Sequence, residues 1–152
     1  MKEGLEQRAK EVFADSPIKI ETRGSRHLGA AVGSKTFQRT FLDAKVKAWV
    51  GYVERLSQFA TTQPHAAFSA FIHNLQSRWS FISRTVPDAA DAFLPLEDAI
   101  NKTFLPALLG RSVNPRERAL LALPARFGGL GISNLRIYAN MRIKPPRPWQ
   151  LP

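Results

Sequence analysis

The strongest constraint on the fold is a seam of apolar residues between residues 35 and 60. Its members recur at alternating four- and three-residue steps, which places them on one face of a helix. They are Leu42, Val46, Trp49, Val53, Leu56 and Ala60. Ser34 stands at the N-cap position, and Thr61 to Pro64 end the pattern. A helix over 35–60 therefore needs other helices against its seam, from this chain or from another protein.

Proline and capping residues divide the following stretch into further helices. Pro64 suits the first turn of a helix over 64–84. One broad face of that helix is apolar and consists of Phe68, Phe71, Ile72, Leu75, Trp79 and Ile82. Pro87 and the caps around Asp88 open another helix, which we expect to bend or break at Pro95 and to end before Gly110. Asn114 and Pro115 then begin a short helix through about Leu121.

The two ends of the chain carry different patterns. Residues 4–15 read as an amphipathic helix that Ser16-Pro17 ends, with Leu5, Ala9, Val12 and Phe13 on one face. Residues 18–22 alternate apolar and polar residues, which predicts a strand; 23–25 predict a turn and 28–32 a second, antiparallel strand. Near the other end, the glycines of 123–132 predict a tight turn. We expect Ser133 and Asn134 to cap a last helix to about Asn140.

These elements predict a mainly helical α+β protein. An N-terminal helix and a β-hairpin precede a bundle of four to five helices. Residues 1–34 and 35–140 form its two regions, and 141–152 form a basic tail with four prolines that we expect to be disordered.

The net charge of +10 is the unusual property of the composition. Residues 111–152 hold eight Lys and Arg against one acid, which leaves +3 for residues 1–110. No acid lies between Glu54 and Asp88, a stretch that carries Arg55, Arg78 and Arg84. Such an excess indicates an anionic partner: nucleic acid, an acidic protein or an anionic membrane face. The sequence has no apolar run of the roughly 18 residues that span a bilayer and no signal peptide, so we expect an intracellular protein, nuclear or cytoplasmic.

Motifs for independent catalysis are missing from the sequence. The absence of cysteine excludes disulfides and thiolate zinc sites. His65 and His73 lie eight residues apart, too far to share one ion, and we expect them to be solvated. The carboxylates Asp88, Asp91, Glu97 and Asp98 flank a helix start and are interpreted as capping groups.

Basic residues cluster around the predicted hairpin and the start of the next helix. They are Arg23, Arg26, Lys35, Arg39, Lys45 and Lys47. A helix N-terminus with free N–H groups attracts anions, so these residues could neutralise phosphates; the alternative is a solubilising surface. We expect most Phe and Trp side chains at helical spacing to form core and not to stack on bases.

Several segments, taken together and in order, resemble one family. They are residues 26–33 (RHLGAAVG), 63–71 (QPHAAFSAF) with Arg78-Trp79, 95–100 (PLEDAI), 104–108 (FLPAL) and 123–132 (LPARFGGLGI). This set resembles the C-terminal region of the reverse transcriptases of retroelements, in particular non-LTR-like and tyrosine-recombinase-type elements. The resemblance covers about residues 2–135.

The resemblance implies specific roles. Residues 26–33 are similar to the primer grip, so Arg26, His27, Leu28, Gly29 and Lys35 would lie near the primer backbone. Secondary contacts to duplex phosphates would come from Arg39, Lys45, Arg78 and Arg84. The helical region would correspond to the thumb and connection.

The resemblance also implies what is missing. The family's catalytic aspartates lie in an Ala-Asp-Asp turn upstream of this region, and Phe13-Ala14-Asp15-Ser16 has one Asp at the end of a helix. The whole polymerase would use Mg²⁺, whose carboxylate ligands are absent here, so we expect no cofactor and no polymerase activity from this chain alone.

The sequence therefore predicts a non-catalytic, template–primer-binding fragment derived from an RNA-directed DNA polymerase. Its partners would be an RNA–DNA or DNA duplex and the missing palm and fingers of a polymerase, with no membrane. Two alternatives stay open: a helical protein-interaction module, or a degenerate retroelement relic without activity.

Overall fold

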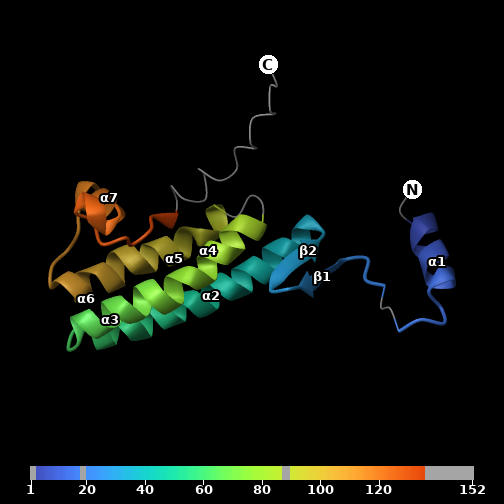
Figure 1. The fold of residues 1–152 in the computed structure, drawn as a ribbon, viewed down its shortest axis with the longest axis horizontal. Helices are drawn as coiled ribbons and strands as arrows, with labels where there is room; N and C mark the ends of the chain where they lie inside the picture. Colours follow the sequence, from blue (N-terminus) through green and yellow to red (C-terminus); the bar gives the residue numbers. More distant parts are fainter. Residues whose placement is uncertain (1–2, 18–19, 87–89, 136–152) are drawn as a thin grey trace, which may run out of the picture.

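The computed structural model describes residues 3–17, 20–86 and 90–135. Its elements are α1 (Glu3–Val12), β1 (Gly24–His27), β2 (Ala30–Gly33), α2 (Lys35–Ala60), α3 (Pro64–Ala70), η1 (Phe71–Leu75), α4 (Gln76–Thr85), η2 (Asp91–Phe93), α5 (Leu94–Ala99), η3 (Ile100–Phe104), α6 (Leu105–Leu109), α7 (Pro115–Leu121) and η4 (Ala125–Phe127). Figure 1 shows α2, α3–α4 and α5–α6 side by side, with the hairpin at one end and α7 at the other. The mainly helical α+β class is confirmed.

Helix α2 has the boundaries that its caps predict. The Phe37 N–H donates to Ser34 Oγ at 3.2 Å, so the N-cap is confirmed. Leu42, Val46, Trp49, Val53 and Ala60 are buried, and Leu56 packs partly buried against the same core. The seam meets α3, α5, α6 and η3, all from this chain. The seam is therefore not free to bind another protein. The hypothesis that this seam packs on a helix from a missing partner is wrong.

Within the described residues, the bundle consists of three rods, each a run of consecutive helical elements, and α2 is the first of them. The second rod runs from α3 through η1 to α4 without a break. Pro64 lies in its first turn, as predicted, and residues 71–75 form a π-helical segment that the sequence did not predict. Phe71, Trp79 and Ile82 are buried. Trp79 packs edge-on to Trp49, with ring centroids 6.1 Å apart. The helical spacing of apolar residues in this rod therefore identified core positions correctly.

The third rod runs from η2 through α5 and η3 to α6. The bend or break expected at Pro95 falls where one element gives way to another: the 3-10 turn η2 ends at Phe93, and α5 begins at Leu94 with Pro95 in its first turn, where its missing N–H is not needed. The expected end is confirmed: Gly110 takes the left-handed conformation with φ +68°. The predicted caps at Pro87 and Asp88 lie outside the described residues.

The N-terminal region differs most from the prediction. Helix α1 ends at Val12 instead of residue 15, and its apolar side chains Leu5 and Val12 are exposed. Figure 1 shows α1 standing clear of the bundle. The predicted strand over 18–22 is wrong at Ile20–Thr22, which form no strand, while 18–19 lie outside the described residues.

The first strand of the hairpin begins six residues later than predicted, at Gly24 instead of residue 18, and the second begins two residues later, at Ala30 instead of residue 28. Strands β1 and β2 pair antiparallel, with Gly24 opposite Gly33 and His27 opposite Ala30. Leu28 and Gly29 form the two-residue turn, both at positive φ (48° and 87°), as a type I′ hairpin requires. The Ser34 N–H donates to the Arg23 carbonyl at 2.9 Å, and Ala31 is buried, which joins the hairpin to the start of α2.

Helix α7 starts as predicted, at Asn114-Pro115, with a complete capping box. Asn114 Oδ1 accepts the Glu117 N–H at 2.9 Å, and the Glu117 carboxylate accepts the Asn114 N–H at 3.0 Å. That backbone hydrogen bond, followed by the one from Arg111, lowers the pKa of Glu117. The capping box therefore selects the ionised carboxylate at the start of this helix.

The glycine-rich segment after α7 turns back along it. The Ile132 and Leu130 N–H groups donate to the Leu121 carbonyl at 3.1 and 3.2 Å. A Cβ at Gly129 would lie 2.0 Å from the Leu123 carbonyl oxygen, so no larger residue fits without a backbone shift. The predicted turn is confirmed. The last predicted helix, to Asn140, lies beyond the described residues except at its start, and the tail of 141–152 lies wholly outside them.

A buried ion pair fixes this returning segment to the bundle. Arg118 donates from Nε and Nη2 to both Glu97 oxygens, at 2.8 and 3.1 Å, and these residues are 4% and 5% exposed. Arg118 also donates to the carbonyls of Ile132 and Ser133, and Glu97 accepts the Leu135 N–H. Interpreting Glu97 as a helix cap was therefore wrong: it is the buried partner of Arg118.

Candidate nucleic-acid interface

The predicted primer-grip residues lie on the hairpin that projects at one end of the bundle. Paired residues share one face of a two-stranded ribbon, and neighbours along a strand alternate. Arg26 pairs with buried Ala31, so it lies on the face toward the bundle, while His27 lies with Ala30 on the other face. Both side chains are exposed. Arg26 and His27 are therefore neighbours in the chain, but their side chains lie on opposite faces of the hairpin.

Leu28 is the first residue of the turn. Its side chain is 88% exposed, and its φ is positive. Positions of this kind favour Gly, Asn or Asp, and holding another residue there costs about 1 kcal/mol or more. Gly29 follows it, close to the Phe81 ring of α4: a Cβ at Gly29 would lie 3.5 Å from that ring. The hairpin turn therefore reaches the surface of the second rod.

Two further predicted residues lie at the start of α2. Lys35 and Arg39 are exposed. Arg39 Nε lies 3.2 Å from Asp43 Oδ1, in a solvated pair of the kind that contributes about 0–1 kcal/mol. At roughly 100° per residue, Lys35 and Arg39 are turned about 100–140° around the helix from Tyr52. They therefore extend the basic surface of the hairpin and do not face the second rod.

Lys45 and Arg78 belong to a different surface. Lys45 Nζ lies 5.7 Å from the centre of the Phe41 ring, and it is half-buried. Arg78 Cζ lies 5.8 Å from the centre of the Tyr52 ring, and its Nη2 donates to Asn74 Oδ1 at 3.1 Å. Arg84 belongs to α4, and its side chain lies outside the described part of the structure. The sequence thus predicted one interface, and the structure divides it into two surfaces.

The second surface contains a groove between α2 and the second rod, which we call the Tyr52 groove. It has a volume of about 520 Å³. Its lining residues are Tyr52, Arg55, Leu56, Phe59, Ala70, Asn74, Leu75 and Arg78. Arg55, which the sequence did not single out as a contact, lies with Cζ 5.1 Å from the Tyr52 ring centre. Arg55 lies in the stretch without acids between Glu54 and Asp88, and that feature of the sequence could have identified it as a candidate contact.

Acidic side chains are turned away from the Tyr52 groove. Asp43 and Glu54 are the two acids in the sequence of α2, and helical geometry places them roughly 160–180° around the helix from Tyr52. The second rod contains no acid over residues 64–85. The charged side chains in the walls that these two helices form are therefore basic, and they lie among aromatic and aliphatic residues.

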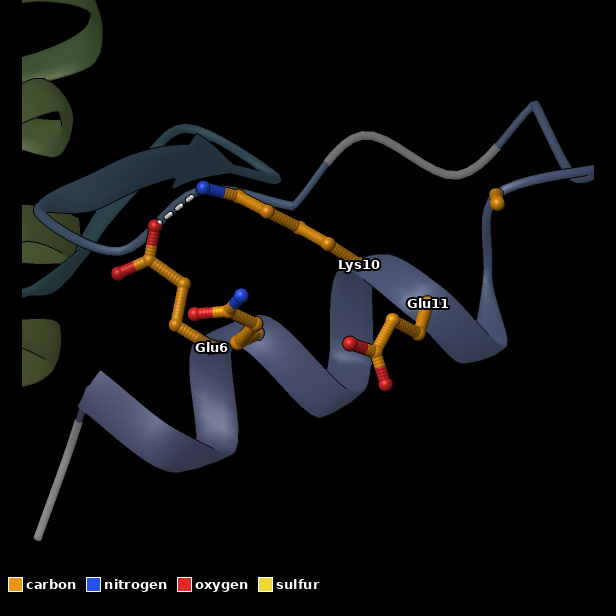
Figure 2. A pocket seen from close by; sticks show the side chains of 5 residues that line it. Glu6, Lys10 and Glu11 are labelled. Atoms are coloured by element: carbon orange, nitrogen blue, oxygen red, sulfur yellow. Dashed lines mark hydrogen bonds and ion pairs between the residues drawn. The ribbon is translucent and has the colours of Figure 1, made fainter.

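A second hollow of similar size lies along α1. Its described lining residues, Glu6, Gln7, Lys10, Glu11 and Ala14, all come from this helix and the turn after it. Figure 2 shows Lys10 reaching across to Glu6, at 2.6 Å, with Glu11 on the neighbouring turn. This hollow lies along one exposed helix, and the single cation among its described lining residues, Lys10, is already paired with Glu6, so it offers no convergent set of groups for a ligand.

No metal centre is formed by the described residues. Within 3–17, 20–86 and 90–135, no three His, Asp or Glu side chains gather as ligands would. His65 and His73 are both exposed. The described residues therefore do not fit the two-metal carboxylate site that the reverse-transcriptase resemblance would associate with Mg²⁺.

No protein-family model, curated protein or solved structure matches this chain. The resemblance to reverse transcriptases therefore stays a prediction that rests on the residues. Among the described residues, no helix is both long enough and apolar enough to cross a bilayer.

Proposed function

We propose that this chain is a non-catalytic nucleic-acid-binding domain that contacts the template–primer duplex of an RNA-directed DNA polymerase. The basic end of the molecule carries the proposal: Arg26, His27, Lys35 and Arg39 are exposed on the hairpin and the first turns of α2. Cations on a projecting ribbon beside a helix start can reach a phosphate backbone. The net charge of +10 supports the same partner. The ligand in this proposal is an RNA–DNA or DNA duplex.

Charge reversal at the hairpin should reduce the salt dependence of duplex binding. Each phosphate neutralised on a B-form duplex contributes about −0.9 to the slope of log K against log salt. We expect Arg26→Glu and Lys35→Glu each to flatten the slope by about one unit and to weaken binding at every sequence tested. Filter binding of an RNA–DNA hybrid across a salt series measures both effects.

The matched control is Lys102→Glu, which makes the same charge change on η3, where Lys102 pairs with Asp98 at 2.7 Å. It should leave the slope close to that of the wild type. If Lys102→Glu flattens the slope as much as Arg26→Glu does, the effect is one of net charge and the hairpin is no specific contact. If the hybrid is not bound at low salt, the proposed function is wrong.

A second candidate function, protein interaction, is favoured by helix α1. Its apolar residues Leu5 and Val12 are exposed, and Figure 1 shows it away from the bundle. An amphipathic helix with an uncovered apolar face gains stability by packing on another surface. In this candidate the partner is a second copy of the chain or the palm and fingers of a polymerase.

Self-association through α1 should depend on its apolar face. We expect light scattering after size exclusion to show concentration-dependent oligomers that the double variant Leu5→Glu/Val12→Glu no longer forms. Leu120→Glu, at an exposed apolar residue of α7, serves as the control and should leave them intact. A wild-type chain that stays monomeric at every concentration would exclude self-association through this helix.

A further inference from the structure

The Tyr52 groove combines features that the hairpin lacks. Tyr52 and Phe59 lie seven residues apart on α2, so their rings are about 10 Å apart along the helix. They are 37% and 47% exposed, well above what core aromatic residues show here. Asn74 and Arg78 face them from the second rod. The groove is thus open to solvent, with two aromatic rings along one wall and the polar Asn74 and Arg78 beside Ala70 and Leu75 along the other.

Two guanidinium groups from different helices converge on the Tyr52 ring. Arg55 lies over the ring at 5.1 Å and donates from Nε to the Gly51 carbonyl at 3.2 Å. Arg78 lies over it at 5.8 Å and donates from Nη2 to Asn74 Oδ1. Within the described residues, neither guanidinium pairs with a carboxylate. Both charges are therefore held in place and available to an anionic ligand.

The aromatic rings beside these arginines favour a nucleic acid over an acidic peptide. Each guanidinium group has five N–H donors and one hydrogen bond to the protein, named above, so it retains donors for either a phosphate or a carboxylate. Planar guanidinium groups over an aromatic ring suit bases, which stack, and phosphates, which need a positive charge nearby. The volume of about 520 Å³ lies within the range of about 300–1,000 Å³ for ligand pockets.

We propose that the Tyr52 groove binds single-stranded nucleic acid, with bases stacked on Tyr52 and Phe59 and phosphates beside Arg55 and Arg78. A stacked strand rises about 3.4 Å per nucleotide, so the distance between the two rings spans roughly three nucleotides. This inference rests on the proposed nucleic-acid function and adds a second ligand form to it. The hairpin contacts a duplex, and the groove holds an unpaired strand that leaves it.

The test is fluorescence anisotropy with labelled oligothymidine. Tyr52→Ala should weaken binding about 5- to 150-fold, the effect expected for loss of one base-stacking aromatic residue. Tyr52→Phe retains the ring and should bind within about twofold of wild type. Arg55→Gln and Arg78→Gln should each flatten the salt slope by about 0.7, the value for one phosphate of a single strand. Thermal unfolding of each variant checks that its fold is intact.

The outcomes separate this inference from the proposed function. If the hybrid duplex is bound through Arg26 while oligothymidine is not bound, the groove inference is wrong and the proposed function stands. If oligothymidine is bound equally by Tyr52→Ala and wild type, the groove is not its site. If a polyglutamate-containing amphipathic peptide binds in a Tyr52-dependent way and oligothymidine does not, the groove is a peptide site. If neither nucleic acid is bound, both proposals fail.

Discussion

Arg118→Ala should lower the free energy of unfolding by about 3–5 kcal/mol, the cost of removing one member of a buried ion pair. Arg118 is 4% exposed and donates to both oxygens of Glu97, which is itself 5% exposed. Without Arg118, the Glu97 charge stays buried, and the Leu135 N–H at 3.0 Å is its remaining hydrogen-bond donor within the described part of the chain. Urea unfolding followed by circular dichroism measures the loss.

Two comparisons show whether burial is the cause. Arg111→Ala removes an exposed pair, Arg111–Glu117 at 2.8 Å, and should cost less than about 1 kcal/mol. The double variant Glu97→Leu/Arg118→Met replaces the buried charges with apolar groups and should be more stable than Arg118→Ala alone. Equal losses for Arg118→Ala and Arg111→Ala would mean that the buried pair does not hold the returning segment.

The helix boundaries could be predicted because their causes are local. Ser34 caps α2 through a hydrogen bond to Phe37, three residues later, and Asn114 caps α7 in the same way. Gly110 ends α6 because its own conformation is left-handed. Each of these features involves residues within one turn of the boundary. A single sequence contains all the information that such a cap needs.

The hairpin was misplaced because its turn does not follow the usual residue preferences. The alternation of Ile18, Ile20 and Thr22 is what a strand shows, yet the strands form at 24–27 and 30–33. The turn is Leu28-Gly29, with leucine at φ +48°. Asn, Asp or Gly is expected there, so Leu28 does not signal a turn at that position. Pairing and tertiary packing decided the register.

The groove and the buried ion pair could not be predicted because they depend on residues far apart in the sequence. Glu97 has the position of a helix-start acid, and only its contact with Arg118, 21 residues later, shows its role. Arg78 meets Tyr52 because the second rod lies beside α2 in one particular register. The charge distribution indicated which stretch was free of acids. It could not indicate which ring the arginines would share.

The stacking of Phe71 on Phe104 is a feature of the core that could not be predicted from the sequence. Each phenylalanine lies at the edge of a π-helical segment, Phe71 at the start of η1 and Phe104 at the end of η3. A π-helical turn inserts an extra residue and shifts the side chains that follow around the helix. The rings stack with centroids 4.5 Å apart and an interplanar angle of 13°. The two irregular turns thus lie where the second and third rods meet through these rings.

Phe71→Ala should therefore destabilise the protein by about 3–5 kcal/mol, the usual cost of truncating a buried phenylalanine. Phe71 is 0% exposed and also packs edge-on to Trp79 at 5.5 Å, so its loss leaves a cavity among large rings. Urea unfolding followed by tryptophan fluorescence measures the change. Phe127→Ala, at an exposed residue of η4, should stay within about 0.5 kcal/mol of wild type. Similar losses for the two variants would mean that the packing of the second rod on the third does not depend on this stack.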